Sequence, residues 1–123
     1  MIIVNEDNSI YLTRGDDVSF GVSVTIDEAP VVFQKGEKLH FKVCEKKNCD
    51  NVVIDKTITI TEAIDSVQIR LTDEETKIGD TINKPVDYWY EIEYIDNSGN
   101  IQTVVGYDEN GAKIFRLFPE GAM

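Results

Sequence analysis

The sequence predicts an all-β protein: a single antiparallel β-sandwich, immunoglobulin-like or of a related Greek-key type, with at most one short helix. Two observations support this fold class. Apolar and polar residues alternate in short runs, and clusters of turn-forming residues separate these runs at intervals of roughly 8–12 residues. The length of 123 residues is that of one domain. We therefore expect one sandwich domain over residues 1–123.

The clearest alternating run spans residues 18–26, where apolar side chains occupy every second position and small polar residues or glycine lie between them. This pattern is typical of a strand with one buried face. Six further strong runs are expected at residues 39–43, 58–60, 67–71, 88–94, 101–105 and 114–118. Weaker candidates are residues 2–4, 10–13 and 52–54, the last of which is a candidate extension of the strand at 58–60.

Turn residues mark two hairpin connections and one helix start. Residues 96–100 (Asp-Asn-Ser-Gly-Asn) and 108–111 (Asp-Glu-Asn-Gly) are rich in residues that tolerate positive φ, so each predicts a hairpin connection. Thr72 and Glu75 have the spacing of a capping box, with acidic residues in the first turn. The sequence therefore predicts a helix of one or two turns over residues 72–77.

Composition and charge exclude several partners. The chain is 41% hydrophobic and 28% charged, so it has enough apolar surface to form a core. Its formal net charge of −11 would repel a phosphate backbone, which argues against a nucleic-acid partner. The longest apolar stretches fall far short of the ~20 residues that span a bilayer. With no basic N-terminal region before residues 2–4, we expect neither a signal peptide nor a membrane partner.

The two cysteines, Cys44 and Cys49, are separated by four intervening residues. Two sulfurs are too few for the disulfide framework of a small secreted domain, which favours free thiols in a reducing compartment. A disulfide within a hairpin loop is the second interpretation. A structural zinc site is the least favoured, because the chain has one histidine and lacks four suitable ligands.

Residues for catalysis or metal binding are sparse. The one histidine, His40, lies in an alternating strand and should point to solvent beside Lys42. No nucleophile elbow, phosphate-binding glycine loop or metalloprotease motif occurs, so we expect neither an enzyme nor a cofactor. Acidic pairs at residues 16–17, 74–75 and 108–109 lack the spacing of a calcium loop, and we expect no metal.

Two surface features are candidate interface sites. Trp89 should lie on the face opposite the tyrosines of residues 88–94, beside acidic residues, where an exposed tryptophan is a candidate interface anchor. The segment from Arg14 through Asp16 to Asp17 contains the tripeptide that integrins recognise, but such a short match is expected by chance, and a turn at Gly15 capped by Asp16 is the favoured interpretation. A carbohydrate-binding module is the alternative function, if Trp89 and a tyrosine share one exposed face.

Several short segments, read together, resemble a known family. They are IYLTRGDD at residues 10–17, GEKLHFKV at 36–43, IRLT at 69–72, DT at 80–81, the tyrosine-rich strand at 88–94 and GNIQTV at 99–104. Their order resembles the N-terminal domain of phage baseplate upper proteins and related tail or prophage β-sandwich proteins.

The resemblance implies a non-catalytic structural or adaptor domain of a phage or prophage tail or baseplate. Such a domain would be made in the bacterial cytoplasm and reside in the virion. Its partners would be other tail or baseplate proteins, and a homo-oligomer is among the assemblies that the resemblance allows. The resemblance implies no active-site residues, because the shared positions are turns and core.

Overall fold

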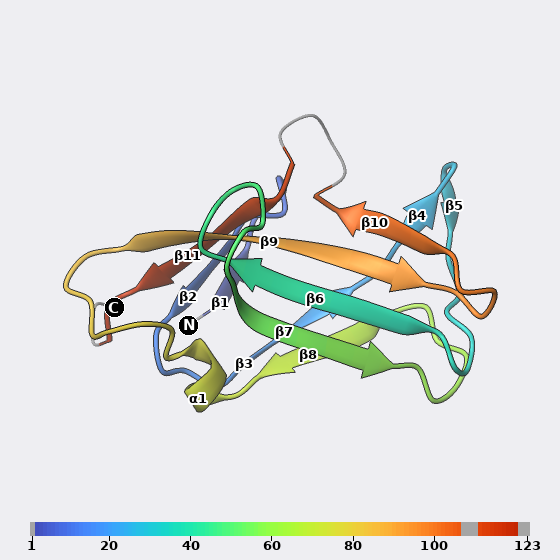
Figure 1. Cartoon of the computed structure of the whole chain (residues 1–123). Helices are drawn as coiled ribbons and strands as arrows, with labels where there is room; N and C mark the ends of the chain where they lie inside the picture. Colours follow the sequence, from blue (N-terminus) through green and yellow to red (C-terminus); the bar gives the residue numbers. More distant parts are fainter. Residues whose placement is uncertain (1, 107–110, 121–123) are drawn as a thin grey trace.

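The computed structural model describes residues 2–106 and 111–120, and it is built almost entirely of strands (Figure 1). The one helix in this part of the chain, α1 (Asp73–Thr76), begins with the predicted capping box at Thr72. The all-β class and the single short helix are therefore confirmed. The strands are β1 (Ile2–Val4), β2 (Ile10–Thr13), β3 (Val18–Val22), β4 (Thr25–Ile26), β5 (Ala29–Pro30), β6 (Lys38–Cys44), β7 (Val52–Thr59), β8 (Val67–Leu71), β9 (Val86–Ile95), β10 (Ile101–Val105) and β11 (Lys113–Phe118).

One large sheet of seven strands dominates the fold, with the order β1-β2-β11-β9-β6-β7 and with β10 paired to β9. The prediction of a purely antiparallel arrangement is wrong at one pair, because β11 runs parallel to β2. Strand β9 is long enough to accept two partners along one edge. Strand β11 pairs with residues 86–90 of β9, and β10 pairs with residues 92–95.

Because they share this edge of β9, strands β10 and β11 are not the two arms of one hairpin. Both strands pair with β9 and not with each other, so the segment predicted as a hairpin at residues 108–111 joins two strands that lie along the same edge of β9. Residues 108–110 themselves lie outside the described residues. The other predicted hairpin is confirmed, since Gly99 adopts φ 84° between β9 and β10 and its N–H donates to the carbonyl of Asp96 at 3.0 Å.

A second layer packs on one face of the large sheet. It contains the two-stranded sheet β3-β8 and the small hairpin β4-β5. The rings of Phe20 on β3 and Phe41 on β6 meet across the two layers at 5.5 Å. Alternate residues of the strands form one apolar cluster between the layers, as the alternating pattern predicted. The immunoglobulin-like or Greek-key type of this arrangement stays a prediction.

The alternating run at residues 18–26 forms two strands, where one was predicted. Strand β3 ends at Val22, and the chain then turns into the β4-β5 hairpin, whose turn holds Asp27 at φ 50° and Glu28 at φ 65°. Val24 stays buried between the two strands, and its carbonyl accepts the N–H of Val31 at 2.8 Å. Side-chain alternation therefore continues through a break in strand pairing, which is why the pattern alone did not show the break.

Candidate functional site

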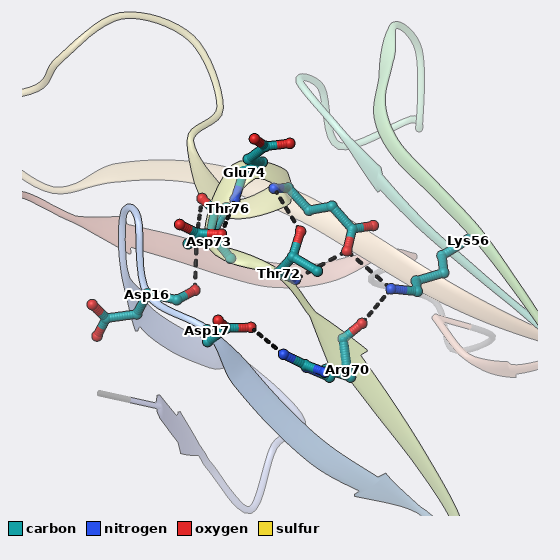
Figure 2. A network of polar contacts seen from close by, with 9 residues as sticks. Asp16, Asp17, Lys56, Arg70, Thr72, Asp73, Glu74 and Thr76 are labelled. Atoms are coloured by element: carbon teal, nitrogen blue, oxygen red, sulfur yellow. Dashed lines mark hydrogen bonds and ion pairs between the residues drawn. The ribbon is translucent and has the colours of Figure 1, made fainter.

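A polar network surrounds α1 and joins it to the strands on either side (Figure 2). The Thr72 hydroxyl accepts the N–H of Glu75, and the Glu75 carboxylate accepts the N–H of Thr72 at 2.9 Å and the Lys56 ammonium at 2.9 Å. Lys56 also donates to the backbone carbonyl of Arg70 on β8. Burial raises the pKa of Glu75, but the Thr72 N–H and the Lys56 ammonium outweigh it and leave this pKa below 4.5. The network therefore ties β7, β8 and α1 together.

The segment from Arg14 to Asp17 is bound mostly within the protein. Arg14 is buried, and its guanidinium donates to the carbonyls of Ile78 and Gly79 and to the carboxylate of Glu120 at 3.3, 2.7 and 2.7 Å. The predicted turn is confirmed, with Gly15 at φ 84°. Since its arginine is inside the fold, this tripeptide does not project as an integrin ligand would.

The two aspartates of this segment lie beside α1 (Figure 2). The backbone carbonyl of Asp16 accepts the Thr76 hydroxyl at 2.9 Å, and the exposed Asp17 carboxylate forms an ion pair with Arg70 at 3.1 Å. As interface residues, Arg14, Asp16 and Asp17 stay a prediction.

Trp89 lies on the outer face of the large sheet, opposite Cys44 on β6 and Ile114 on β11. It is half-buried and lines a hollow of about 220 Å³ together with Ser9 and Lys47. Tyr90 and Tyr94 lie on the other face of β9, buried in the core as predicted. Trp89 therefore shares no exposed face with these tyrosines, and its role as an interface anchor stays a prediction.

One tyrosine, Tyr11, does lie on the outer face with Trp89. The guanidinium of Arg116 covers its ring at 5.0 Å from the centroid, and the ring of Phe118 lies 5.8 Å away. Tyr11 pairs with Arg116, two residues along β11 from the Ile114 that faces Trp89. The stacked pair of open aromatic rings that a sugar-binding face needs is therefore not formed by these two residues.

Charged side chains on the outer face bind one another across neighbouring strands. His40 lies between two carboxylates, with Nδ1 3.0 Å from Glu93 and Nε2 2.5 Å from Asp55. In the same way Lys42 pairs with Glu91 at 3.4 Å, and Arg116 with Asp87 at 2.6 Å. His40 points to the solvent side, as predicted, and each of its ring nitrogens faces a carboxylate.

Cys44 and Cys49 form a disulfide, with Cα atoms 4.9 Å apart. The preference for free thiols was therefore wrong, and the second interpretation, a disulfide within the hairpin loop, is confirmed. The reason is local geometry. The β6–β7 connection is tight, with Cys49 and Asn51 both at φ 58° and the N–H of Cys49 donating to the Lys46 carbonyl at 2.8 Å, which returns Cys49 to Cys44.

Within residues 2–106 and 111–120, no three His, Cys, Asp or Glu side chains are grouped so that they could hold a metal ion. In the same part of the chain, no helix is long and apolar enough to cross a bilayer.

The two layers meet along two borders, which differ in how they are sealed. We call the border between β7 and β8 the closed seam. There Lys56 on β7 reaches the backbone carbonyl of Arg70 on β8, and Phe33 exchanges two backbone hydrogen bonds with Ile64, at 2.8 and 3.0 Å. Phe33 is fully buried, and its ring contacts Tyr94 at 5.3 Å. Side chains and backbone both cross this border.

The opposite border, which we call the open seam, consists of the free edges of β1, β3 and β10. In the described chain each of these strands pairs with one neighbour alone: β1 with β2, β3 with β8 and β10 with β9. A hollow of about 460 Å³ lies between residues 23–27 and residues 102–105. A smaller hollow of about 80 Å³ continues it past Phe20 to Val4, and both hollows are lined by Ser23.

Large apolar side chains are exposed beside the open seam. Val4 on β1 lines the smaller hollow and is 51% exposed. Ile3 on β1 and Ile101 on β10 are 46% and 61% exposed; they belong to the same edge strands but line neither hollow. Tyr90 holds the rim in place, because its hydroxyl donates to the carbonyl of Asn8 in the β1–β2 turn. Sequence reasoning missed this site. The uncharged run at residues 18–26 was visible, but which of its strand edges lacks a partner depends on the topology.

No family model, curated protein or solved structure matches the chain. The resemblance to phage baseplate proteins therefore rests on the short sequence motifs.

Proposed function

We propose that this chain is a non-catalytic structural or adaptor domain of a phage or prophage tail or baseplate, and that it acts through protein–protein contacts. The observation that supports this proposal is the open seam, where three unpaired strand edges border the same pair of hollows. Unpaired edges present rows of free N–H and C=O groups, and assemblies commonly cover such edges with neighbouring subunits.

The composition of these edges supports the same proposal. Proteins that stay monomeric protect their edge strands with charged residues, proline, bulges or covering segments. Strands β1 (Ile2–Val4) and β3 (Val18–Val22) contain no charged residue and no proline. By contrast β7, at the other edge of the large sheet, contains Asp55 and the inward-reaching Lys56. The unprotected edges are thus confined to one side of the molecule.

The segments that resemble the phage family occupy structural positions in this fold. The Thr13 to Asp16 segment is the closed turn at Arg14, and the tyrosine-rich strand supplies core residues. These are the roles that the resemblance implies, since it carries over no active site. The net charge of −11 favours protein partners with basic surfaces over nucleic acid.

Capture of partners from a lysate of the source bacterium, after induction of its prophage, tests this function. We expect the tagged protein to recover tail or baseplate proteins, identified by mass spectrometry. The double variant Ile3→Lys/Val4→Lys should lose them, because it places charge on an unprotected edge. Val52→Lys is the matched control, since Val52 is 43% exposed on β7, away from the open seam. If no tail component is recovered from a lysate shown to contain them, the proposal is wrong.

A further inference from the structure

We propose that the open seam receives an extended segment of a partner protein, which adds to the free edge of β3 as a third strand beside β3 and β8. The segment would have alternating apolar residues in its centre and basic residues at its ends. This inference rests on the proposed function and names the partner's chemistry and the strand that binds it. Strand addition of this kind gains affinity from backbone hydrogen bonds and specificity from alternate side chains.

Strand β3 is the best acceptor because its own sheet is the least complete. The second layer contributes two paired strands, β3 and β8, against seven in the large sheet. Two strands are a marginal unit, and a third strand adds both hydrogen bonds and apolar cover. Residues 18–26 contain no charge and no proline, so nothing in the strand or its continuation opposes pairing.

The other two edges of the open seam are weaker acceptors. Strand β1 has three residues, which limits the number of hydrogen bonds that a partner gains. Strand β10 has a register shift between Thr103 and Val105, and such a bulge bends an edge away from further pairing. These strands form the opposite wall of the hollows, which apolar side chains of the added segment would enter.

The exposed fractions of the core side chains show that β3 is less completely covered than the centre of the large sheet. Val18, Phe20 and Val22 keep 6%, 7% and 6% exposure, whereas Leu39 and Phe41 on β6 have 0%. The smaller hollow reaches Phe20 and Val22 directly. Apolar side chains of an added strand would remove this remaining surface from water, which favours binding.

Acidic residues near the open seam indicate that the ends of the partner segment are basic. Asp27 lines the wider hollow, Glu28 follows it in the β4–β5 turn, and Glu6 lies in the β1–β2 turn. None of the three forms an ion pair with a described residue. A second copy of this chain would bring another net charge of −11 to the same place, so a partner with lysine or arginine beside its apolar core fits better.

A peptide array combined with hydrogen exchange tests this assignment directly. The probes are peptides of about nine residues that alternate valine or isoleucine with threonine, flanked by paired lysines. Control peptides replace the flanking lysines with glutamates, or place a proline at the centre. We expect the lysine-flanked peptides to bind, to slow amide exchange in β3, and to bind at least about tenfold more weakly when their flanks are glutamate.

Variants of the protein separate the seam from the rest of the surface. Ser23→Lys places a charge in both hollows, and we expect it to weaken peptide binding at least about tenfold. Gln68→Lys is the matched control, because Gln68 lies on β8 in the same small sheet but borders the closed seam, and it should bind as the original protein does. Asp27→Asn keeps a residue that tolerates positive φ and should reduce the preference for lysine flanks.

Four results would overturn the inference. The first is that no array peptide binds, and the second is that a bound peptide slows amide exchange in β1 or β10 while exchange in β3 is unchanged. The third is that Ser23→Lys and Gln68→Lys lose binding equally. The fourth is that the protein alone forms a dimer in which amide exchange in β3 is slowed. None of them bears on the recovery of tail proteins from a lysate. Failure of the strand assignment is therefore distinguishable from failure of the proposed function.

Discussion

The closed and open seams are the two borders of the same pair of layers, yet they are built in different ways. At the closed seam, Lys56 and Phe33 reach across the border and engage backbone groups of the opposite segment. At the open seam, the edges of β1, β3 and β10 face hollows, and these three strands contain no lysine or arginine that could reach across as Lys56 does. The difference is that the fold closes one border with its own side chains and backbone, whereas at the other border the described strands have edges without a paired neighbour.

Substitutions at the closed seam should lower the stability of the fold the most. Phe33→Ala removes a fully buried ring that contacts Tyr94, and we expect it to lower the free energy of unfolding by about 3–5 kcal/mol. Urea denaturation followed by circular dichroism measures this change. A loss below about 1 kcal/mol, as for a typical surface site, would show that the closed seam does not hold the layers together.

Loss of the disulfide should have the next largest effect, because it closes the loop before β7, the strand that forms the closed seam. The bond joins residues five positions apart, and restriction of so short a loop in the unfolded chain stabilises by about 2 kcal/mol. The double variant Cys44→Ala/Cys49→Ala should lose about this amount in urea denaturation. A reductant should destabilise the original protein and leave the variant unchanged, and an equal response of both would contradict this explanation.

Lys56→Met should weaken the closed seam without opening a cavity. It removes hydrogen bonds from an ammonium to Glu75 and to the Arg70 carbonyl, which we expect to cost about 1–2 kcal/mol at neutral pH. The pKa of Glu75 is lowered in the folded protein, so its contribution is present above pH 4.5 and is lost as the pH falls through the folded pKa. The stability gap between Lys56→Met and the original protein should therefore narrow in acid.

A matched variant locates that effect. Lys38→Met removes an exposed lysine of β6 that has no role at the closed seam. The stability gap between this variant and the original protein should not change measurably over the same titration. If both variants follow the same pH profile, the effect belongs to net charge and not to the contact between Lys56 and Glu75.

The end of the closed seam near Phe33 depends on a smaller contact. The Tyr94 hydroxyl donates to the buried Glu37 carboxylate at 2.7 Å, and Glu37 also accepts the N–H of Gln34 at 2.8 Å. Tyr94→Phe should cost about 1 kcal/mol, because Glu37 keeps another donor. Burial, followed by the Glu37 hydrogen bond, raises the pKa of Tyr94 from 10.0 to about 12. Stability should therefore fall as the pH rises from 10.0 towards 12, and by less in Tyr94→Phe.

Much of the architecture was predictable because its causes are local. The alternating runs located the strong strands, the capping box at Thr72 located α1, and the alternation in β9 placed Tyr90 and Tyr94 in the core. Two features were not predictable in this way. The parallel pairing of β11 with β2 depends on which strands meet at long range, and the disulfide depends on the turn geometry around Cys49.

The candidate site was harder to predict for the same reason. Trp89 and Arg14 were predicted as interface residues from their residue types, yet Arg14 is bound inside the fold. The open seam is defined by edges of β1, β3 and β10 that have no paired neighbour among the described residues, and no single segment encodes such an edge. Residue chemistry predicts where a strand lies, whereas only the topology shows which of its edges lacks a neighbour.

The smallest effect on stability should come from the open seam itself, and this contrast tests the comparison most directly. Ile3→Ser changes a residue that is 46% exposed, so we expect a change within about 0.5 kcal/mol in urea denaturation. Its effect should appear in partner capture, where loss of an exposed apolar side chain weakens binding. A destabilisation comparable to that of Phe33→Ala would contradict the comparison, because the edge of β1 would then stabilise the isolated fold as much as the closed seam does.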